Sequence, residues 1–148
     1  MRPILIVEDD AALAKQIVDL FERYRYACRA IDSFDDVDVQ VATLDPALVL
    51  LDVNLPRYDG FYWCRRIRES SHVPILMVSA RLEDVDKIRA LGLGADDYII
   101  KPFSPSELAA RVKAHLARYE RLKGSAGDAA VLRFGALEIQ PQTRRVFL

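Results

Sequence analysis

The feature that most constrains the fold of this chain is an unbroken apolar run, Ala47–Leu51, with Pro46 before it and Pro56 a few residues after it. A short run without polar residues predicts a strand that is buried on both faces, as in the middle of a parallel sheet. An acidic residue, Asp52, follows the run directly. Because open α/β sheets bind ligands outside the carboxyl ends of their strands, Asp52 is a candidate functional residue.

The composition is typical of a globular protein in a reducing compartment. The chain has 148 residues, of which 51% are hydrophobic and 29% charged, and its net charge is −1. No apolar run approaches the roughly 20 residues needed to cross a membrane. The N-terminus lacks the pattern of a signal peptide. The only cysteines, Cys28 and Cys64, are too few for a disulfide framework. We therefore expect a cytoplasmic protein without a membrane partner.

Strand and helix patterns alternate five times along the chain. Besides Ala47–Leu51, strands are predicted over Ile4–Val7, Tyr26–Ile31, Pro74–Val78 and Asp97–Ile100. Apolar residues at helical spacing predict helices over Ala11–Arg25, Phe34–Thr43, Phe61–Glu69, Leu82–Leu91 and Pro105–Leu122. This alternation predicts an α/β fold, a doubly wound parallel sheet with helices on both faces. The flavodoxin-like strand order 2-1-3-4-5 is favoured, because right-handed crossovers leave few others.

Local signals indicate where several helices begin and which side chains they expose. Ser104, Pro105 and Glu107 form a capping box with proline at the first helical position. Ser33 resembles the start of the second helix. Arg68 lies opposite the apolar face of the third helix, so we expect its side chain in solvent.

The last part of the chain changes character. Residues 123–130 are small, polar and glycine-rich, which predicts a linker after a domain spanning residues 1–122. Short apolar runs within residues 131–148, separated by glycine and proline, predict antiparallel strands. So short a segment cannot form a stable domain alone. It packs on the main domain or another chain, or it begins a domain that is cut off.

Four predicted strand ends meet at one edge of the sheet. They carry Glu8 and Asp9, Asp52, Ser79 and Lys101. Three close carboxylates repel one another, and Mg²⁺ relieves this repulsion while leaving coordination positions open for phosphate oxygens. Lys101 can pair with a phosphoryl oxygen, and the Ser79 hydroxyl can donate to another. Asp52 is then a nucleophile that forms an aspartyl phosphate.

Taken singly, these residues have structural explanations. An acidic residue or serine at a strand end is often a helix cap, and a lysine before proline is often merely solvated. The complementary set on four strand ends favours a functional site. The two histidines, His72 and His115, lack a metal-ligand or nucleophile partner at a suitable spacing. We expect both of them to be structural or surface residues.

The strand-end motifs resemble those of the receiver domain of two-component response regulators. They are ILIVEDD at 4–10, LLDVNLP at 50–56 with Asp59-Gly60, MVSA at 77–80 and GADDYIIKPF at 94–103. The resemblance covers about residues 3–120 and implies a CheY-like fold. It implies a signalling protein, not an enzyme, in which Asp52 accepts a phosphoryl group from a phosphohistidine of a sensor histidine kinase. Such a domain assists its own phosphorylation and slow dephosphorylation.

The resemblance also assigns individual roles at the site. Asp9 and Asp52 would bind Mg²⁺ directly, with the backbone carbonyl of Asn54 as a third ligand and Glu8 acting through water. Ser79 and Lys101 would hold the phosphoryl oxygens.

The resemblance also implies a switch pair and a cis peptide bond. Ser79 and Tyr98 would form the switch pair, in which the hydroxyl moves toward the phosphate and the ring turns inward. The Lys101–Pro102 peptide bond is expected to be cis.

Within the family, the motifs resemble those of OmpR/PhoB-type transcription factors. That type dimerises through the fourth helix, fifth strand and fifth helix, where Lys87 with Glu107 and Asp97 with Arg111 stand at matching positions. Gly92 stands where the pattern has an acidic residue. Residues 131–148 resemble the first strands of a winged-helix domain without its recognition helix. DNA binding would therefore need the missing C-terminal domain.

Three alternatives are compared with this interpretation. A haloacid dehalogenase-type phosphatase needs a second aspartate two residues after the nucleophile, where this chain has Asn54. A flavodoxin-like FMN carrier needs a phosphate loop after the first strand, but the acidic residues there would repel phosphate. A degenerate receiver that only docks partners is disfavoured by the complete acidic set and Lys101.

Overall fold

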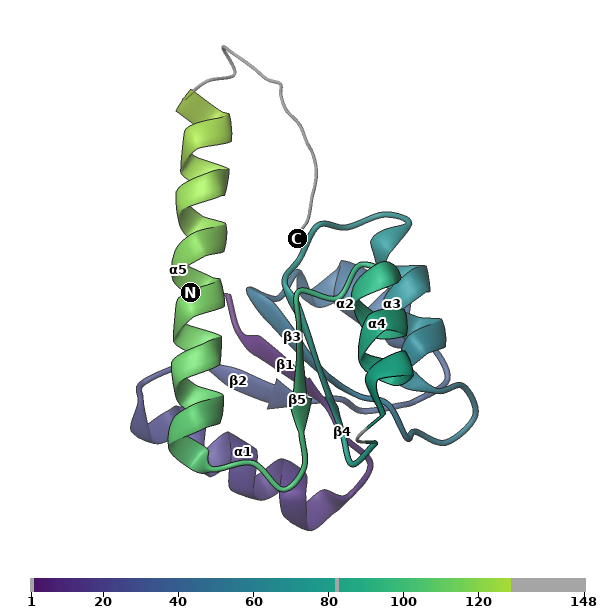
Figure 1. The fold of residues 1–148 in the computed structure, drawn as a ribbon. Helices are drawn as coiled ribbons and strands as arrows, with labels where there is room; N and C mark the ends of the chain where they lie inside the picture. Colours follow the sequence, from purple (N-terminus) through teal and green to yellow (C-terminus); the bar gives the residue numbers. More distant parts are fainter. Residues whose placement is uncertain (1, 82, 129–148) are drawn as a thin grey trace. The chain divides into compact units, whose positions relative to one another are not determined.

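The computed structural model describes residues 2–81 and 83–128. The elements in chain order are β1 (Ile4–Val7), α1 (Ala11–Arg23), β2 (Cys28–Ala30), α2 (Val37–Leu44), β3 (Leu48–Asp52), α3 (Gly60–Arg68), β4 (Ile75–Ser79), α4 (Asp84–Gly92), β5 (Asp97–Ile100) and α5 (Pro105–Asp128) (Figure 1). The chain divides into two units, Met1–Leu116 and Ala117–Leu148. The sheet and its covering helices belong to the first unit.

The strands form one parallel sheet in the order β2-β1-β3-β4-β5, which confirms the predicted α/β fold. The apolar run singled out from the sequence becomes the central strand β3. It pairs with β1 through Ile6 opposite Leu50 and with β4 through Leu50 opposite Leu76. All residues of β1, β3 and β4 are buried, which explains their continuous apolar sequences.

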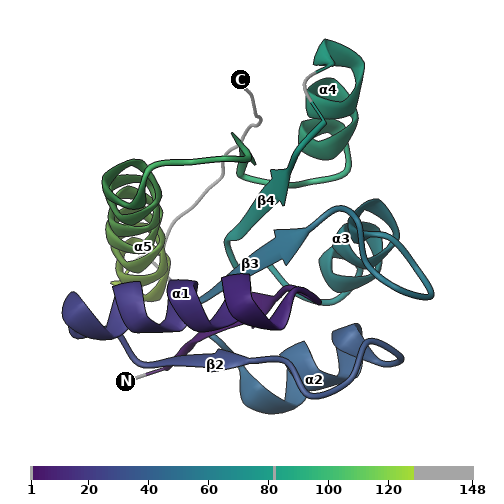
Figure 2. The same cartoon turned by 90° about the horizontal axis from the view of Figure 1, so that it is seen from below.

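Alternate residues of the strands face two separate apolar cores. On one side, Val49 and Leu51 of β3 pack with residues of α2, α3 and α4. On the other side, Leu48 and Leu50 pack with residues of α1 and the first turns of α5. Figure 2 shows the two sets of helices on opposite faces of the sheet. Each fully buried leucine or isoleucine stabilises the fold by about 1.5–3 kcal/mol, so these layers hold the strand ends in place.

Two helix caps follow the sequence signals. The Asp10 carboxylate caps α1 by accepting hydrogen bonds from the backbone N–H groups of Ala12 and Leu13. At α5, the Glu107 N–H donates to Ser104 Oγ at 3.0 Å, as predicted. The reciprocal half of the capping box is absent here, because the Glu107 carboxylate pairs with Arg111 instead.

Two helix boundaries differ from the sequence predictions by three residues or more. The helix α2 begins at Val37, not at Phe34. Ser33 Oγ accepts a hydrogen bond from the Asp35 N–H, and this local turn competes with helix formation. Likewise, α5 continues to Asp128, so residues 123–128 of the expected linker are helical. The predicted antiparallel strands within 131–148 lie outside the described residues.

The prediction that Arg68 faces solvent is also wrong. Its side chain is 19% exposed and pairs with Asp96 at the start of β5. Helical spacing alone does not show this contact, because Asp96 is distant in sequence. Among the residues that the structure describes, no helix combines the length and apolar character needed to cross a membrane.

Candidate functional site

Three carboxylates come together at the carboxyl edge of the sheet. Because Val7 of β1 stands opposite Leu51 of β3, the acidic residues that end these strands reach the same place. One carboxylate oxygen from each of Glu8, Asp9 and Asp52 lies within 4.8 Å of the others. Glu8 and Asp52 are buried and Asp9 is exposed, so the cluster has one side open to solvent.

Lys101 supplies the positive charge of the site. It follows β5, and its Nζ lies 2.9 Å from Glu8 Oε1 and 3.4 Å from Asp52 Oδ1. Burial by itself would lower the pKa of Lys101, but Glu8 and Asp52 outweigh burial and raise that pKa. The side chain therefore stays protonated between the two carboxylates. The Lys101–Pro102 peptide bond is cis, as the resemblance implies.

Asp52 is held in an environment that disfavours its charge. Burial, and then the negative charge of Glu8, raise the pKa of Asp52 to about 6, although Lys101 acts in the opposite direction. Asp52 Oδ1 is buried, and Lys101 Nζ, 3.4 Å away, makes an ion pair with it but no well-aligned hydrogen bond. A buried carboxylate oxygen without a well-aligned donor is costly, and a cation would satisfy it. The three-carboxylate set therefore fits a hard divalent cation such as Mg²⁺.

Ser79 and Tyr98 both contact the same backbone segment. Ser79 ends β4 and is fully buried, and its Oγ accepts a hydrogen bond from the Arg81 N–H at 3.0 Å. Tyr98 is 5% exposed, with its ring inside the core, and its hydroxyl donates to the Arg81 carbonyl oxygen at 3.2 Å. The structure thus links the two residues of the expected switch pair through the backbone of Arg81, a connection that sequence reasoning missed.

The side chain of Arg81 bridges the two loops beside the acidic cluster. Its Nη2 donates to Asn54 Oδ1 at 3.1 Å, and its Nη1 lies 3.6 Å from Asp86 Oδ1. Asn54 is exposed two residues after Asp52. The bridge therefore connects the loop after β3 to the beginning of α4.

Gly60 packs directly against the end of β3. A side chain on Gly60 would collide with the backbone of Asp52 and Val53. The Gly60 N–H also donates to the Val53 carbonyl oxygen at 2.8 Å. Only glycine allows α3 to start this close to the candidate phosphoacceptor.

The residues expected at a dimer interface lie along α4, β5 and α5. In this single chain Arg111 pairs with Asp97 at 2.7 Å and with Glu107 at 3.2 Å. Asp97 also contacts His115, for which sequence reasoning found no partner. Lys87 is exposed on α4. Of the two expected pairs, the one between Asp97 and Arg111 thus forms within a single chain, where Arg111 also pairs with Glu107.

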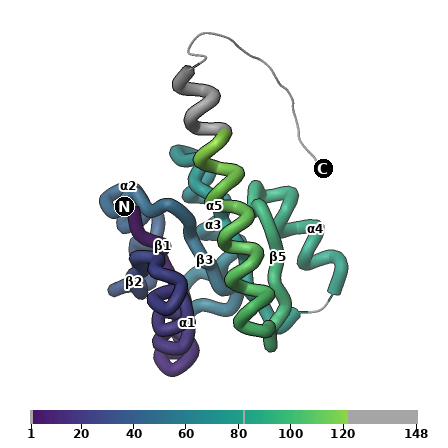
Figure 3. The backbone as a smooth tube through the Cα atoms, turned by 90° about the vertical axis from the view of Figure 1, so that its left-hand side faces the viewer, coloured from purple at the N-terminus to yellow at the C-terminus, as the bar shows by residue number. Residues whose placement is uncertain are grey.

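The helix α4 exposes an apolar stripe on the same face. Val85, Ile88 and Leu91 are 67%, 68% and 46% exposed. In Figure 3, β5 lies between α4 and α5. We refer to the surface formed by Val85, Ile88, Leu91, Asp97 and Arg111 as the α4–β5–α5 face.

A second surface feature was not expected from the sequence. A cavity of about 680 Å³ lies between α1 and the segment after β5, and Lys101 forms part of its lining. Most of the lining is apolar, from Leu13, Ile17, Leu20, Pro102 and Phe103. Its residues come from chain segments far apart in sequence, so only the fold reveals it.

Comparison with known proteins identifies the family. Residues 4–113 match the response regulator receiver domain. The chain belongs to this family. The receiver domain is 45% identical over 111 residues to the response regulator protein GraR of Staphylococcus saprophyticus, covering 75% of this chain and 50% of GraR. It is 38% identical over 143 residues to the transcriptional regulatory protein YvcP of Bacillus subtilis, covering 95% of this chain and 60% of YvcP.

A solved structure supports the same identification. The BeF3-activated N-terminal receiver domain of Klebsiella pneumoniae RstA superimposes with a TM-score of 0.74 at 33% identity, covering 77% of this chain and 97% of that one. The chain spans about half the length of the curated relatives that it matches. Membership of the receiver family confirms the resemblance and makes this a signalling domain of two-component systems.

Proposed function

We propose that this receiver domain accepts a phosphoryl group on Asp52 from a phosphohistidine of a sensor histidine kinase, in a reaction that requires Mg²⁺. The observation that carries the proposal is the meeting of Glu8, Asp9 and Asp52 beside the ammonium group of Lys101. An isolated acidic cluster would need no lysine of its own. The combination is suited to a phosphoryl group whose charge must be neutralised from several sides.

In this reaction an oxygen of the Asp52 carboxylate forms a bond to phosphorus while the bond from phosphorus to the donor imidazole nitrogen breaks. The electron pair of the broken bond stays on that imidazole. Asp52 acts in its ionised form, which prevails above its pKa of about 6. Lys101 leaves its position between Glu8 and Asp52 far enough to pair with a phosphoryl oxygen, and the Ser79 hydroxyl donates to another.

The proposed metal ligands are Asp9 and Asp52 directly, the backbone carbonyl of Asn54, and Glu8 through water. The acidic set fits such an ion because its oxygens converge and one buried oxygen of Asp52 accepts no well-aligned hydrogen bond. When bound, Mg²⁺ neutralises charge on the transferring phosphoryl group. The same groups would assist the slow hydrolysis of the aspartyl phosphate.

The signal would leave the site through Ser79 and Tyr98. A hydroxyl that turns toward a phosphoryl oxygen gives up its contact with the Arg81 N–H, and Tyr98 contacts the carbonyl of that same residue. A displacement of Arg81 would therefore alter its contacts with Tyr98 of β5 and Asp86 of α4. We propose that this biases the α4–β5–α5 face toward forming a homodimer.

The wider role concerns the parent protein in the cytoplasm. We propose that residues 1–122 are the receiver, that residues 123–130 connect it, and that residues 131–148 begin a winged-helix domain. Transcriptional regulation and DNA binding would depend on the rest of that domain. The match to YvcP, which extends over 95% of this chain, supports this proposal.

The test is the intact mass of the protein after incubation with acetyl phosphate, with and without Mg²⁺. We expect a gain of one phosphoryl group that requires Mg²⁺ and is absent in Asp52→Asn. Asp10→Asn is the matched control, since Asp10 caps α1 and lies outside the acidic cluster. No gain under any condition would overturn the proposal and leave a docking module on the same fold.

A further inference from the structure

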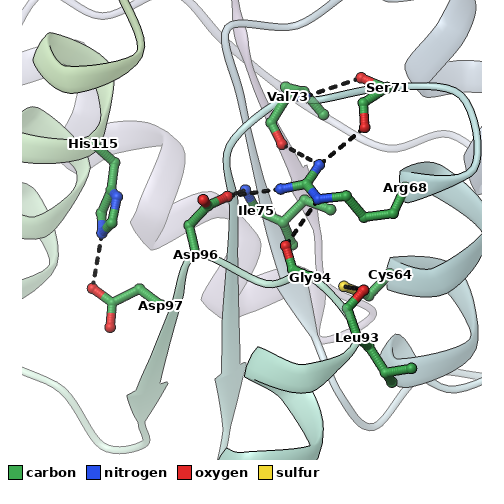
Figure 4. Close-up of polar contacts among 10 residues, drawn as sticks. All are labelled: Cys64, Arg68, Ser71, Val73, Ile75, Leu93, Gly94, Asp96, Asp97 and His115. Carbon is green, nitrogen blue, oxygen red and sulfur yellow. Dashed lines mark hydrogen bonds and ion pairs between the residues drawn. The ribbon is translucent and has the colours of Figure 1, made fainter. Parts of the chain in front are cut away.

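The Asp97 carboxylate is shared between an arginine and a histidine of α5. Asp97 Oδ1 lies 2.7 Å from Arg111 Nη1 and accepts the Tyr98 N–H at 2.8 Å. Asp97 Oδ2 lies 3.1 Å from His115 Nε2. Figure 4 shows His115 on α5 pointing to Asp97 at the start of β5. The carboxylate thus has one oxygen for arginine and the other for histidine.

The contact with His115 is shielded from water. The side chains of His115 and Asp97 are 14% and 22% exposed, whereas Arg111 is 40% exposed. His115 therefore makes the more buried of the two contacts with the Asp97 carboxylate, and Arg111 lies closer to the surface. A contact at this depth is screened less by solvent and salt than an exposed ion pair.

The charged groups around His115 can be named element by element among the described residues. From β5, Asp97 faces the ring, whereas the neighbouring Asp96 pairs with Arg68 of α3. Along α5, Arg111 contacts the same carboxylate and Glu107 pairs with Arg111 on its other side.

Beside β5, β4 presents an apolar residue, and the charges of α4 include two that have partners elsewhere and the exposed Lys87. Opposite Asp97, β4 presents Leu76, an apolar residue. On α4, Asp86 pairs with Arg81 and Arg89 lies over the Phe61 ring. His115 is the histidine of this cluster, and histidine is the residue type that ordinarily changes its charge between about pH 5 and 8.

Asp97 itself stays ionised over that range. Burial would raise the pKa of Asp97, but His115, the Tyr98 N–H and Arg111 outweigh burial and lower it. Protonation of His115 therefore adds a positive charge against a carboxylate that is already negative. A charge-assisted hydrogen bond is about twice as strong as a neutral one.

We infer that His115 makes the α4–β5–α5 face sensitive to pH. A protonated His115 holds Asp97 in its own chain more strongly than a neutral one, and this raises the cost of turning Asp97 toward Arg111 of a second copy. The inference rests on the proposed dimerisation through this face and adds a regulator to it. In a two-fold dimer the contact occurs twice, so protonation of both copies weakens the interface at two places.

The first experiment measures the dimer dissociation constant of the full chain by sedimentation velocity at pH 6 and pH 8. Mg²⁺ and beryllofluoride are present in saturating excess, as a stable mimic of the phosphoryl group. We expect dimerisation to be weaker at pH 6 by about threefold to tenfold, corresponding to two modest charge contacts.

Two matched variants identify the histidine responsible. His115→Gln keeps a hydrogen-bond donor without a titrating charge, and it should remove most of the difference between the two pH values. His72→Gln changes the chain's other histidine, which is exposed in the loop after α3, and should keep the difference. All three proteins share Asp52, so titration of that residue contributes equally. If His115→Gln shows the same pH dependence as the wild type, the inference is overturned.

A second measurement tests the contact without any dimer. A double-mutant cycle of His115→Gln and Asp97→Asn is followed by urea unfolding of the unactivated protein. The coupling between the two residues should be larger at pH 6 than at pH 8, by about threefold in the unfolding equilibrium constant. A coupling that does not depend on pH contradicts the inference while leaving the dimer untouched. The absence of a dimer at both pH values, with this coupling intact, overturns the proposed dimerisation and the regulation of it.

Discussion

Arg68 Nη2 donates a hydrogen bond to Asp96 Oδ2 at 2.8 Å, and this pair connects the C-terminal end of α3 to the start of β5. The rest of the guanidinium is also occupied, because it donates to the carbonyl oxygens of Gly94 at 2.9 Å and Val73 at 2.6 Å. Figure 4 shows Arg68 surrounded by these acceptors. Asp96 in turn accepts the N–H of Ile75, the first residue of β4. One arginine therefore organises the edge of the sheet opposite the acidic cluster.

Replacing Arg68 should destabilise the fold strongly. Arg68→Met leaves Asp96 partly buried without its cation and removes the arginine donor from three carbonyl oxygens, those of Ser71, Val73 and Gly94. We therefore expect a loss of about 2–4 kcal/mol in the free energy of unfolding. Urea denaturation followed by the fluorescence of Trp63, the only tryptophan, measures this loss. Arg65→Met, on the exposed side of the same helix, should change the free energy by less than about 0.5 kcal/mol. Equal effects of the two substitutions would contradict the role given to Arg68.

The raised pKa of Asp52 predicts a pH-dependent gain of stability on its removal. The folded-state pKa is about 6 against an ordinary value of 3.8, so protonated Asp52 is favoured in the fold. Its contribution to stability is present below pH 3.8 and is lost as the pH rises through about 6. The difference between the folded-state pKa and the ordinary pKa of Asp52 corresponds to about 3 kcal/mol of stability. Asp52→Asn should therefore stabilise the protein by about 2 kcal/mol at pH 8 and by much less at pH 4. The check is chemical denaturation at both pH values, and a gain that is the same at both would count against this explanation.

Mg²⁺ should stabilise the folded protein through the acidic cluster. At a free concentration about ten times its dissociation constant, a ligand that binds only the folded state adds about 1.4 kcal/mol. We expect Mg²⁺ to raise the melting temperature of the wild type, and excess EDTA to reverse the rise. Asp9→Asn should abolish most of the effect, whereas Asp10→Asn should keep it. The rise should shrink at pH 5, because protons compete for Asp52. If Mg²⁺ raises the melting temperature of Asp9→Asn as much as that of the wild type, the ion binds at another site.

The contact of Gly60 with β3 can be tested with alanine. Gly60→Ala forces a methyl group into the backbone of Asp52 and Val53, so we expect a loss of about 2–4 kcal/mol in stability and reduced labelling by acetyl phosphate. Gly92→Ala is the control, because a Cβ at this helical position meets no atom within 4 Å. It should be neutral or stabilise the protein by up to about 1 kcal/mol. Thermal unfolding and intact mass report the two effects.

The exposed apolar stripe of α4 should be required for dimerisation. Burying the Ile88 side chain is worth about 1.5–3 kcal/mol per copy, so Ile88→Glu should weaken the dimer formed with beryllofluoride and Mg²⁺ by more than about tenfold. Val39→Glu tests an equally exposed apolar residue on α2, outside this face, and should leave the dimer unchanged. Sedimentation velocity gives both dissociation constants. If the dimer tolerates Ile88→Glu but not Val39→Glu, the interface includes α2 and not α4.

Much of the fold follows from patterns that act over short distances in the chain. The unbroken apolar runs predicted buried strands, and the alternation of strands and helices predicted the sheet order that the structure shows. Ser104 predicted the start of α5, because a cap acts within three residues. The acidic cluster could also be predicted, since parallel strands that follow one another end at the same edge of the sheet.

Contacts between residues distant in sequence were decided only by the tertiary structure. Helical spacing placed Arg68 toward solvent, but the fold brings Asp96 and three carbonyl oxygens to it. His115 had no partner at a suitable spacing, yet α5 lies along β5 and sets its ring against Asp97. The link from Ser79 to Tyr98 through Arg81 needs two strand ends and a loop to meet. Sequence alone therefore determined the local elements and the edge where the chemistry lies, because these depend on periodicity and caps. Packing of separate elements determined the partners of each charge, because those distances exist only once the chain has folded.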